Sequence, residues 1–131
     1  MTISTPITAL YAGILAILVL VLALRVVQMR RASEVGLGDG GNDLLLRRIR
    51  IHGNAVEYIP IALFLMLVLE LNGASAMLMH GLGVALVVGR AAHVQGMTSS
   101  AGASTGRVVG NVLTWGVFLV GGLRAIAIGL A

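Results

Sequence analysis

The sequence contains no cysteine and no lysine, and it has only two prolines and few aromatic residues. The lack of cysteine excludes disulfide bonds, thiolate metal sites and a cysteine nucleophile, so any thiol chemistry needs a thiol supplied by a ligand. All nine cationic side chains other than histidine are arginine, a bias that suggests a GC-rich, bacterial genome. Charged residues make up 11% of the chain, well below the roughly 25% of soluble domains, and mean hydropathy is +1.01. The composition therefore predicts an integral membrane protein.

Four apolar runs separated by polar segments predict an all-α, four-helix transmembrane bundle. We expect helices at about residues 7–27, 44–71, 74–94 and 107–128. At about 1.5 Å per residue, the first and last apolar runs cross a hydrocarbon layer of roughly 30 Å, and the middle two do so with their flanking turns. One bundle with helices alternating up and down uses residues 1–131 as a single domain.

Arginines are concentrated in two of the connecting segments, and their placement sets the expected orientation. Five lie between the first two apolar runs, at about residues 7–27 and 55–71, and two lie between the last two, at about 74–88 and 108–128, whereas the N-terminal tail and the turn Asn72-Gly73 have none. The positive-inside rule then places the arginine-bearing segments in the cytoplasm and both termini outside. No arginine precedes Arg25, which favours a retained first helix over a cleaved signal peptide. We expect a multi-pass protein of the bacterial inner membrane, surrounded by lipids, with no nucleic-acid partner.

Small residues recur at intervals of four in the last two expected helices. Gly81, Ala85 and Gly89 share one face of the third helix, and Gly106 and Gly110 begin the fourth. Small residues at this interval let the backbones of membrane helices approach closely. We interpret both stripes as packing faces.

Polar side chains line the start of the second helix, at the expected edge of the membrane. Arg50, Asn54 and Glu57 stand at i, i+4 and i+7, which is one helix stripe, and Tyr58 flanks it. Ionisable groups at a membrane edge are costly without partners or water, so they are candidates for a functional site. Pro60 removes a helical hydrogen bond just beyond the stripe and should bend the helix there.

Alternating helix directions bring more polar residues to the same end. The third helix ends with Arg90 and His93, and the fourth begins with Arg107. Together with the stripe they give three arginines against one glutamate, which suits an anionic ligand that also carries a cationic group. The histidines lack metal-ligand spacing, so we expect no metal site. Glu70 and Asn72 lie near the opposite end, where we expect them to be solvated.

Purely structural interpretations of these residues stay open. Arg47, Arg48 and Arg90 are typical orientation signals that extend toward lipid headgroups. An ion pair with Arg50 would satisfy Glu57 without any ligand.

Two motifs and one arginine resemble those of a known family. They are Arg50-x-x-x-Asn54-x-x-Glu57-Tyr58-x-Pro60, Arg90-x-x-His93-x-x-Gly96, and Arg107 at the head of the fourth helix. In these residues, and in layout over essentially the whole chain, the sequence is similar to the MAPEG family, the membrane-associated proteins in eicosanoid and glutathione metabolism. The sequence looks like a bacterial member related to the microsomal glutathione transferases. The resemblance implies a homotrimer with a glutathione site between neighbouring subunits.

The resemblance also implies a role for individual residues. Arg107 would be catalytic, because a thiol with a pKa of about 8.5 is mostly protonated at neutral pH and a nearby guanidinium favours its reactive anion. The remaining expected contacts to glutathione, the thiol co-substrate, are Arg50, Asn54, Glu57, Tyr58, His52, Arg90 and His93, with Arg30 or Arg31 reaching across from the adjacent subunit.

These observations lead us to expect a membrane-bound glutathione-dependent transferase or peroxidase that acts on hydrophobic electrophiles. Met97 stands where many family members have a tyrosine, so a second hypothesis is a non-enzymatic protein that binds a lipid or a partner in the groove between subunits. A small transporter is a third. It would need an ionisable group in the middle of the membrane, and the third helix offers only His80 between residues 74 and 89.

Overall fold

The computed structural model describes residues 4–131, which form four α-helices and no strand. The helices are α1 (Pro6–Ser33), α2 (Asp43–Leu71), α3 (Ala76–Ser99) and α4 (Thr105–Gly129). Each is long and apolar enough to cross a membrane, so the prediction of an all-α, four-helix fold is confirmed. The helix ends differ from the expected ones most in α1, which continues past Val27 and so carries Arg30 and Arg31 in its last turn.

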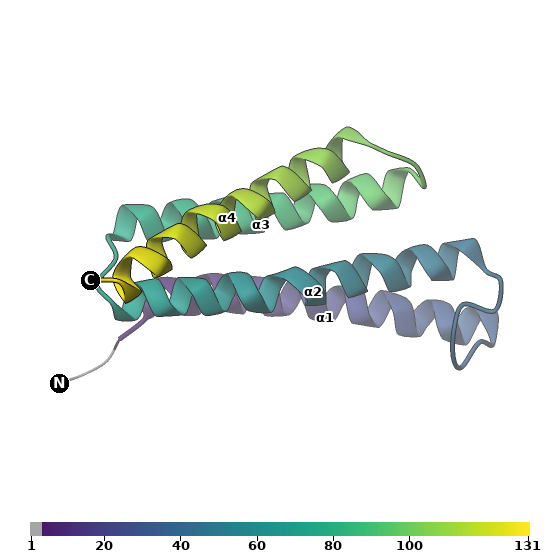
Figure 1. Ribbon diagram of the computed structural model, residues 1–131. Helices are drawn as coiled ribbons and strands as arrows, with labels where there is room; N and C mark the ends of the chain where they lie inside the picture. Colours follow the sequence, from purple (N-terminus) through teal and green to yellow (C-terminus); the bar gives the residue numbers. More distant parts are fainter. Residues whose placement is uncertain (1–3) are drawn as a thin grey trace.

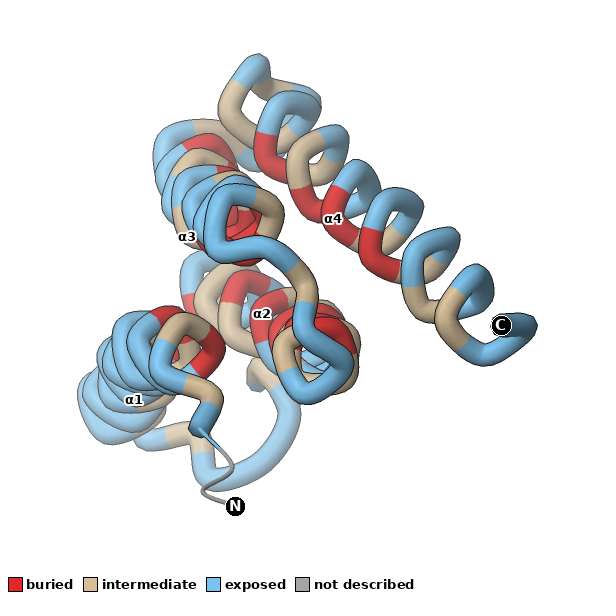
Figure 2. Tube along the Cα trace, turned by 90° about the vertical axis from the view of Figure 1, so that its left-hand side faces the viewer, coloured by how far each residue is buried: buried red, intermediate tan, exposed pale blue. Residues whose placement is uncertain are grey.

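The helices form two hairpins whose connections lie at opposite ends of the molecule (Figure 1). The loops 34–42 and 100–104 share one end, which we call the loop end, and the short turn 72–75 lies at the other end with both termini. α3 packs most extensively on α4, and α1 on α2. Within the described residues α1 and α4 make no contact, because α2 and α3 lie between them (Figure 2).

The molecule is apolar both inside and outside. Leu15, Met66 and Leu86, from three different helices, are completely buried in the core. The outer surface carries large exposed hydrophobic side chains such as Ile17 and Phe64. Helices with apolar side chains on all faces are expected where the surrounding solvent is lipid.

Helix α2 has a side-chain cap at its start and stays continuous past its proline. The Asn42 side chain caps it by accepting hydrogen bonds from the amides of Leu44 and Leu45, each at 3.0 Å. The helix then runs without interruption through Pro60 to Leu71. One continuous helix therefore connects the loop end to the turn at 72–75.

Glu70 fastens the beginning of α1 to the end of α2. Its carboxylate oxygens accept the backbone N–H groups of Ile7 at 2.9 Å and Thr8 at 2.7 Å. The first amides of a helix lack partners within the helix, and a negative charge there also favours the helix dipole. The expectation that Glu70 is merely solvated is therefore wrong, whereas Asn72 is exposed as expected.

Glycines set the distance between α3 and α4, but not all along the stripe. A Cβ on Gly110 would stand 2.6 Å from the Gly89 carbonyl oxygen, and one on Gly106 would stand 2.7 Å from the Ala92 carbonyl oxygen. The predicted packing face is thus confirmed toward the loop end. It is wrong for Gly81, which has open space beside it. The helices separate there and leave an apolar groove of about 480 Å³.

We expect Gly110→Ala to destabilise the protein and Gly116→Ala to leave its stability unchanged or slightly higher. The first methyl group must displace the backbone of α3, at a cost of about 1–3 kcal/mol, whereas nothing lies within 4 Å of the second. Thermal unfolding of the two purified variants in one detergent measures the difference. Equal melting temperatures would contradict the close approach of the two backbones.

Candidate functional site

Arg90 lies at the centre of the loop-end half of the bundle and is only 1% exposed. Its Nε donates to Thr114 Oγ1 at 3.0 Å, and Nη1 donates to Asn54 Oδ1 at 2.7 Å. Nη2 donates to the carbonyl oxygen of Gly110 at 3.2 Å. The guanidinium carbon also stands 5.3 Å from the centre of the Tyr58 ring, within the range of a cation–π contact. One side chain of α3 is therefore bound to both α2 and α4.

This network satisfies the donors of Arg90 without neutralising its charge. All its partners are neutral, and no carboxylate within residues 4–131 forms an ion pair with it. Removing one acceptor would leave a buried cation short of a hydrogen bond, which is strongly destabilising. The interpretation of Arg90 as an orientation signal extended toward headgroups is wrong. Its role as a ligand contact stays a prediction.

The stripe on α2 divides into a buried and an exposed part. Asn54 turns toward Arg90, whereas Arg50 and Glu57 form an ion pair at 3.6 Å on the surface, with side chains 54% and 55% exposed. Such exposed pairs contribute at most about 1 kcal/mol to stability. Gly53 lies beneath the pair and keeps the space there open. Both charged groups are thus accessible to a ligand.

A cavity of about 390 Å³ opens where α2 begins, α3 ends and α4 begins. Its lining residues are Asp43, Leu46, Arg47, Arg50, Met97, Ser100, Ala101 and Arg107. The structure thus brings Arg50 and Arg107 to one cavity, which we call the arginine cavity. Three arginines and one carboxylate line it, the same charge balance as in the set expected from the sequence but with Arg47 and Asp43 in place of Arg90 and Glu57.

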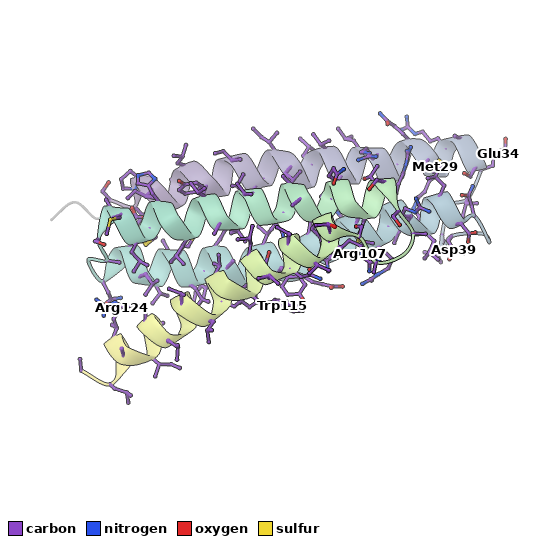
Figure 3. All side chains as sticks on the ribbon, turned by 90° about the horizontal axis from the view of Figure 1, so that it is seen from above. Met29, Glu34, Asp39, Arg107, Trp115 and Arg124 are labelled. Carbon is purple, nitrogen blue, oxygen red and sulfur yellow. The ribbon has the colours of Figure 1, made fainter. Side chains whose placement is uncertain are left out.

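Arg107 is positioned by the cap of its own helix. Ser104 Oγ accepts the Arg107 backbone N–H at 3.4 Å and donates to the Gly96 carbonyl at 3.0 Å, which joins the start of α4 to the end of α3. The residue as a whole is half-buried, and its Nη1 donates to the carbonyl oxygen of Gly102 at 2.8 Å in a hydrogen bond that is exposed at the surface. Figure 3 shows Arg107 at the loop end of α4 and Arg124 near the other end.

Asn111 is a candidate that the sequence interpretation missed. It lies one turn after Arg107, and both line a second hollow of about 330 Å³. Its Oδ1 is buried and has no hydrogen-bond partner within the described residues. An amide alone in an apolar helix, four residues from a conspicuous arginine, is a signal that could have identified it.

The other expected residues lie around this centre. His93 is 3% exposed and packs beneath Gly110, and His52 is half-buried on α2. Arg30 donates to the carbonyl oxygen of Gly38 at 2.7 Å, whereas Arg31 is exposed. Neither histidine nor Arg30 or Arg31 lines the arginine cavity, so their contacts with a ligand stay predictions. No group of side chains within residues 4–131 could hold a metal ion.

Comparison with known proteins identifies the family of the chain. The sequence matches the MAPEG family over residues 8–127, nearly its whole length. The chain belongs to the MAPEG family. Among its relatives is the inner membrane protein YecN of Escherichia coli strain K12, which is 48% identical over 90 residues, or 69% of each chain. YecN of strain O6:H1 (CFT073) shows the same identity and coverage. The resemblance seen in the sequence is confirmed for the family.

We expect Thr114→Val to destabilise this MAPEG protein and Thr98→Val to have little effect. Both hydroxyls donate to the carbonyl four residues earlier, at 2.8 and 2.7 Å, but only Thr114 also accepts from Arg90. Its loss leaves a buried charged donor unpaired, at a cost of about 1–3 kcal/mol. Thermal unfolding compares the two variants. A Thr114→Val protein as stable as Thr98→Val would mean that the network does not stabilise the fold.

Proposed function

We propose that this MAPEG protein resides in the bacterial inner membrane, binds glutathione in the arginine cavity and joins it through its sulfur atom to hydrophobic electrophiles. The name of the relative YecN supports the membrane location, and the resemblance to the MAPEG family supports the ligand class. The observation that carries the proposal is the presence of both Arg50 and Arg107 in one cavity, at the end of the bundle where the membrane-edge arginines gather. By the positive-inside rule, that end faces the cytoplasm.

The charges of the cavity match those of glutathione, which has two carboxylates and one ammonium group. Arg47 and Arg50 offer guanidinium groups for the carboxylates, and Asp43 or Glu57 offers a carboxylate for the ammonium. Asn54 and Tyr58 contribute to the site indirectly, because Arg90 holds both side chains in place.

Arg107 is the residue that would activate the thiol. The positive charge of this half-buried residue favours the thiolate over the thiol, and the thiolate is the nucleophile in this chemistry. The thiolate attacks the electrophilic carbon of an aryl halide, a carbon–sulfur bond forms, and halide leaves. Leu46 and Met97 give the cavity an apolar wall for such a substrate, which arrives from the bilayer.

A neighbouring subunit would complete the site in a homotrimer. The Arg50–Glu57 pair lies half-exposed on the outside of the subunit, as a contact shared with a neighbour requires. Of the two arginines at the end of α1, Arg31 is the better candidate for reaching across. The guanidinium of Arg30 is already bound to the carbonyl oxygens of Gly38 and Val35.

Two observations favour a second function, in which the protein binds a lipid or a partner without catalysis. A donor of Arg107 already bonds the Gly102 carbonyl of its own loop, as a purely structural cap would. Met97 also brings no hydroxyl to the cavity. The two functions differ in whether the thiol reacts.

We expect Arg107→Ala to lower the rate of glutathione conjugation to a chlorodinitrobenzene by about 100- to 1000-fold, as for other groups that stabilise a reacting anion. Arg124→Ala is the matched control, because Arg124 lies exposed near the opposite end of α4 and should leave the rate unchanged (Figure 3). The measurement is the rate per subunit in detergent.

Ligand binding separates the two functions independently of rate. Glutathione should raise the melting temperature saturably, since it binds only the folded state, whereas glycine with matched salt should not. Stabilisation by glutathione but not by glycine favours the transferase. Absence of both stabilisation and conjugation would contradict the transferase and leave the non-enzymatic function.

We expect Arg31→Ala to weaken glutathione binding without changing the stability of the ligand-free protein. Arg30→Ala should instead lower that stability, because it removes the hydrogen bonds that hold loop 34–42, each contributing about 1 kcal/mol. Titration with glutathione, followed by thermal shift, measures both quantities. Unaltered affinity in Arg31→Ala would show that Arg31 does not reach the neighbouring site.

A further inference from the structure

A hollow of about 440 Å³ lies between α1 and α3, and it shares no lining residue with the arginine cavity. It is lined by Leu18, Arg25, Ala91, Val94, Gln95, Thr98 and Ser99. We call it the α1–α3 groove. It belongs to the loop-end half of the bundle, because Thr98 and Ser99 are in the last turn of α3.

Arg25 is the unexplained residue in this groove. It is the one charged residue of α1 before Arg30, within the most hydrophobic of the four helices. Its guanidinium makes no hydrogen bond or ion pair with any of residues 4–131, although the side chain is half-buried. A cation at this depth is costly unless it meets a partner, and it sits about 7.5 Å along the helix from the membrane-edge Arg30.

A second arginine adds to the unbalanced charge. Arg48 of α2 donates from Nη1 to the carbonyl oxygen of Arg25 at 3.0 Å, so its guanidinium lies against the same turn of α1. Its Nε is buried and has no partner within the described residues. Arg48 does not line the groove, and no carboxylate does. Arg25 is therefore the one charged side chain among the lining residues, and a cation without a carboxylate favours an anion from outside the chain.

Polarity changes along the groove in the way an amphiphile requires. Leu18 lies about 10 Å along α1 from Arg25, toward the middle of the membrane, and Ala91 lies about 6 Å along α3 from Gln95 in the same direction. At the polar end, Thr98 and Ser99 donate their hydroxyl protons to carbonyls of their own helix. The remaining side-chain donors are the guanidinium of Arg25 and the amide of Gln95.

From these contacts we infer that the α1–α3 groove binds an anionic phospholipid. The phosphodiester lies against Arg25, and an acyl chain runs past Leu18 and Ala91. Basic grooves between membrane helices at the membrane edge recognise such headgroups. A free anion would gain nothing from the apolar half, and a zwitterionic lipid would bring its own cation to Arg25. This site does not depend on glutathione.

The test titrates the purified protein in detergent with dioctanoyl phosphatidylglycerol, and in parallel with dioctanoyl phosphatidylcholine and inorganic phosphate. Melting temperature and lipid adducts in native mass spectrometry are the readouts. Phosphatidylglycerol should bind saturably, and the other two much more weakly. Arg25→Gln should weaken phosphatidylglycerol binding by about five- to tenfold, whereas the control Arg124→Gln should not.

A second variant tests the apolar half and does not rely on the charge. Ala91→Leu fills the groove and leaves both arginines in place, so it should also weaken binding of phosphatidylglycerol. Both variants should keep the stabilisation by glutathione, which separates this site from the arginine cavity. Three results would each overturn the inference: equal affinity in Arg25→Gln and Arg124→Gln, wild-type affinity in Ala91→Leu, or equal binding of phosphatidylcholine or inorganic phosphate.

Discussion

The hydrogen bonds of the buried Arg90 guanidinium are the interaction on which the rest of the site depends. They join Asn54 of α2 to Thr114 and the Gly110 carbonyl of α4 through a single residue of α3. The close approach of α3 and α4 at Gly89 and Gly110 is what brings that carbonyl within reach. With the three helices in this register, the beginning of α4 stands beside the beginning of α2, and the arginine cavity forms between them.

The polar groups of the loop end lie at different depths in the bundle, and the groups at each depth have a different role. The innermost layer is the neutral network around Arg90, which fixes the helices. Outside it lies the exposed Arg50–Glu57 pair, and at the helix ends lies the cavity that Arg50 and Arg107 both line. Groups that stabilise the fold are therefore separate from groups free to bind a charged ligand. In lipid such a separation is needed, because a polar group without a partner is expensive there.

The sequence predicts the helices and the end at which the polar residues gather, because long apolar runs and alternating directions leave little choice. It could not tell buried from exposed arginines. Arg90 and Arg47 have the same local signal, an arginine near a helix end, but Arg90 is buried where α4 packs closely on α3 at Gly110. Likewise, the role of Glu70 depends on α1 starting beside it, sixty-three positions earlier than its place in the chain. Such contacts are set by tertiary packing and leave no local pattern.

The central claim is that the arginine cavity holds a thiol ligand against Arg107. The most direct test is an experimental structure of the oligomer with bound glutathione, in which the position of the sulfur atom is measured. We expect the sulfur atom to contact the Arg107 guanidinium and the carboxylates of the ligand to lie near Arg47 and Arg50. Glutathione bound elsewhere, or a sulfur out of reach of Arg107, would contradict it.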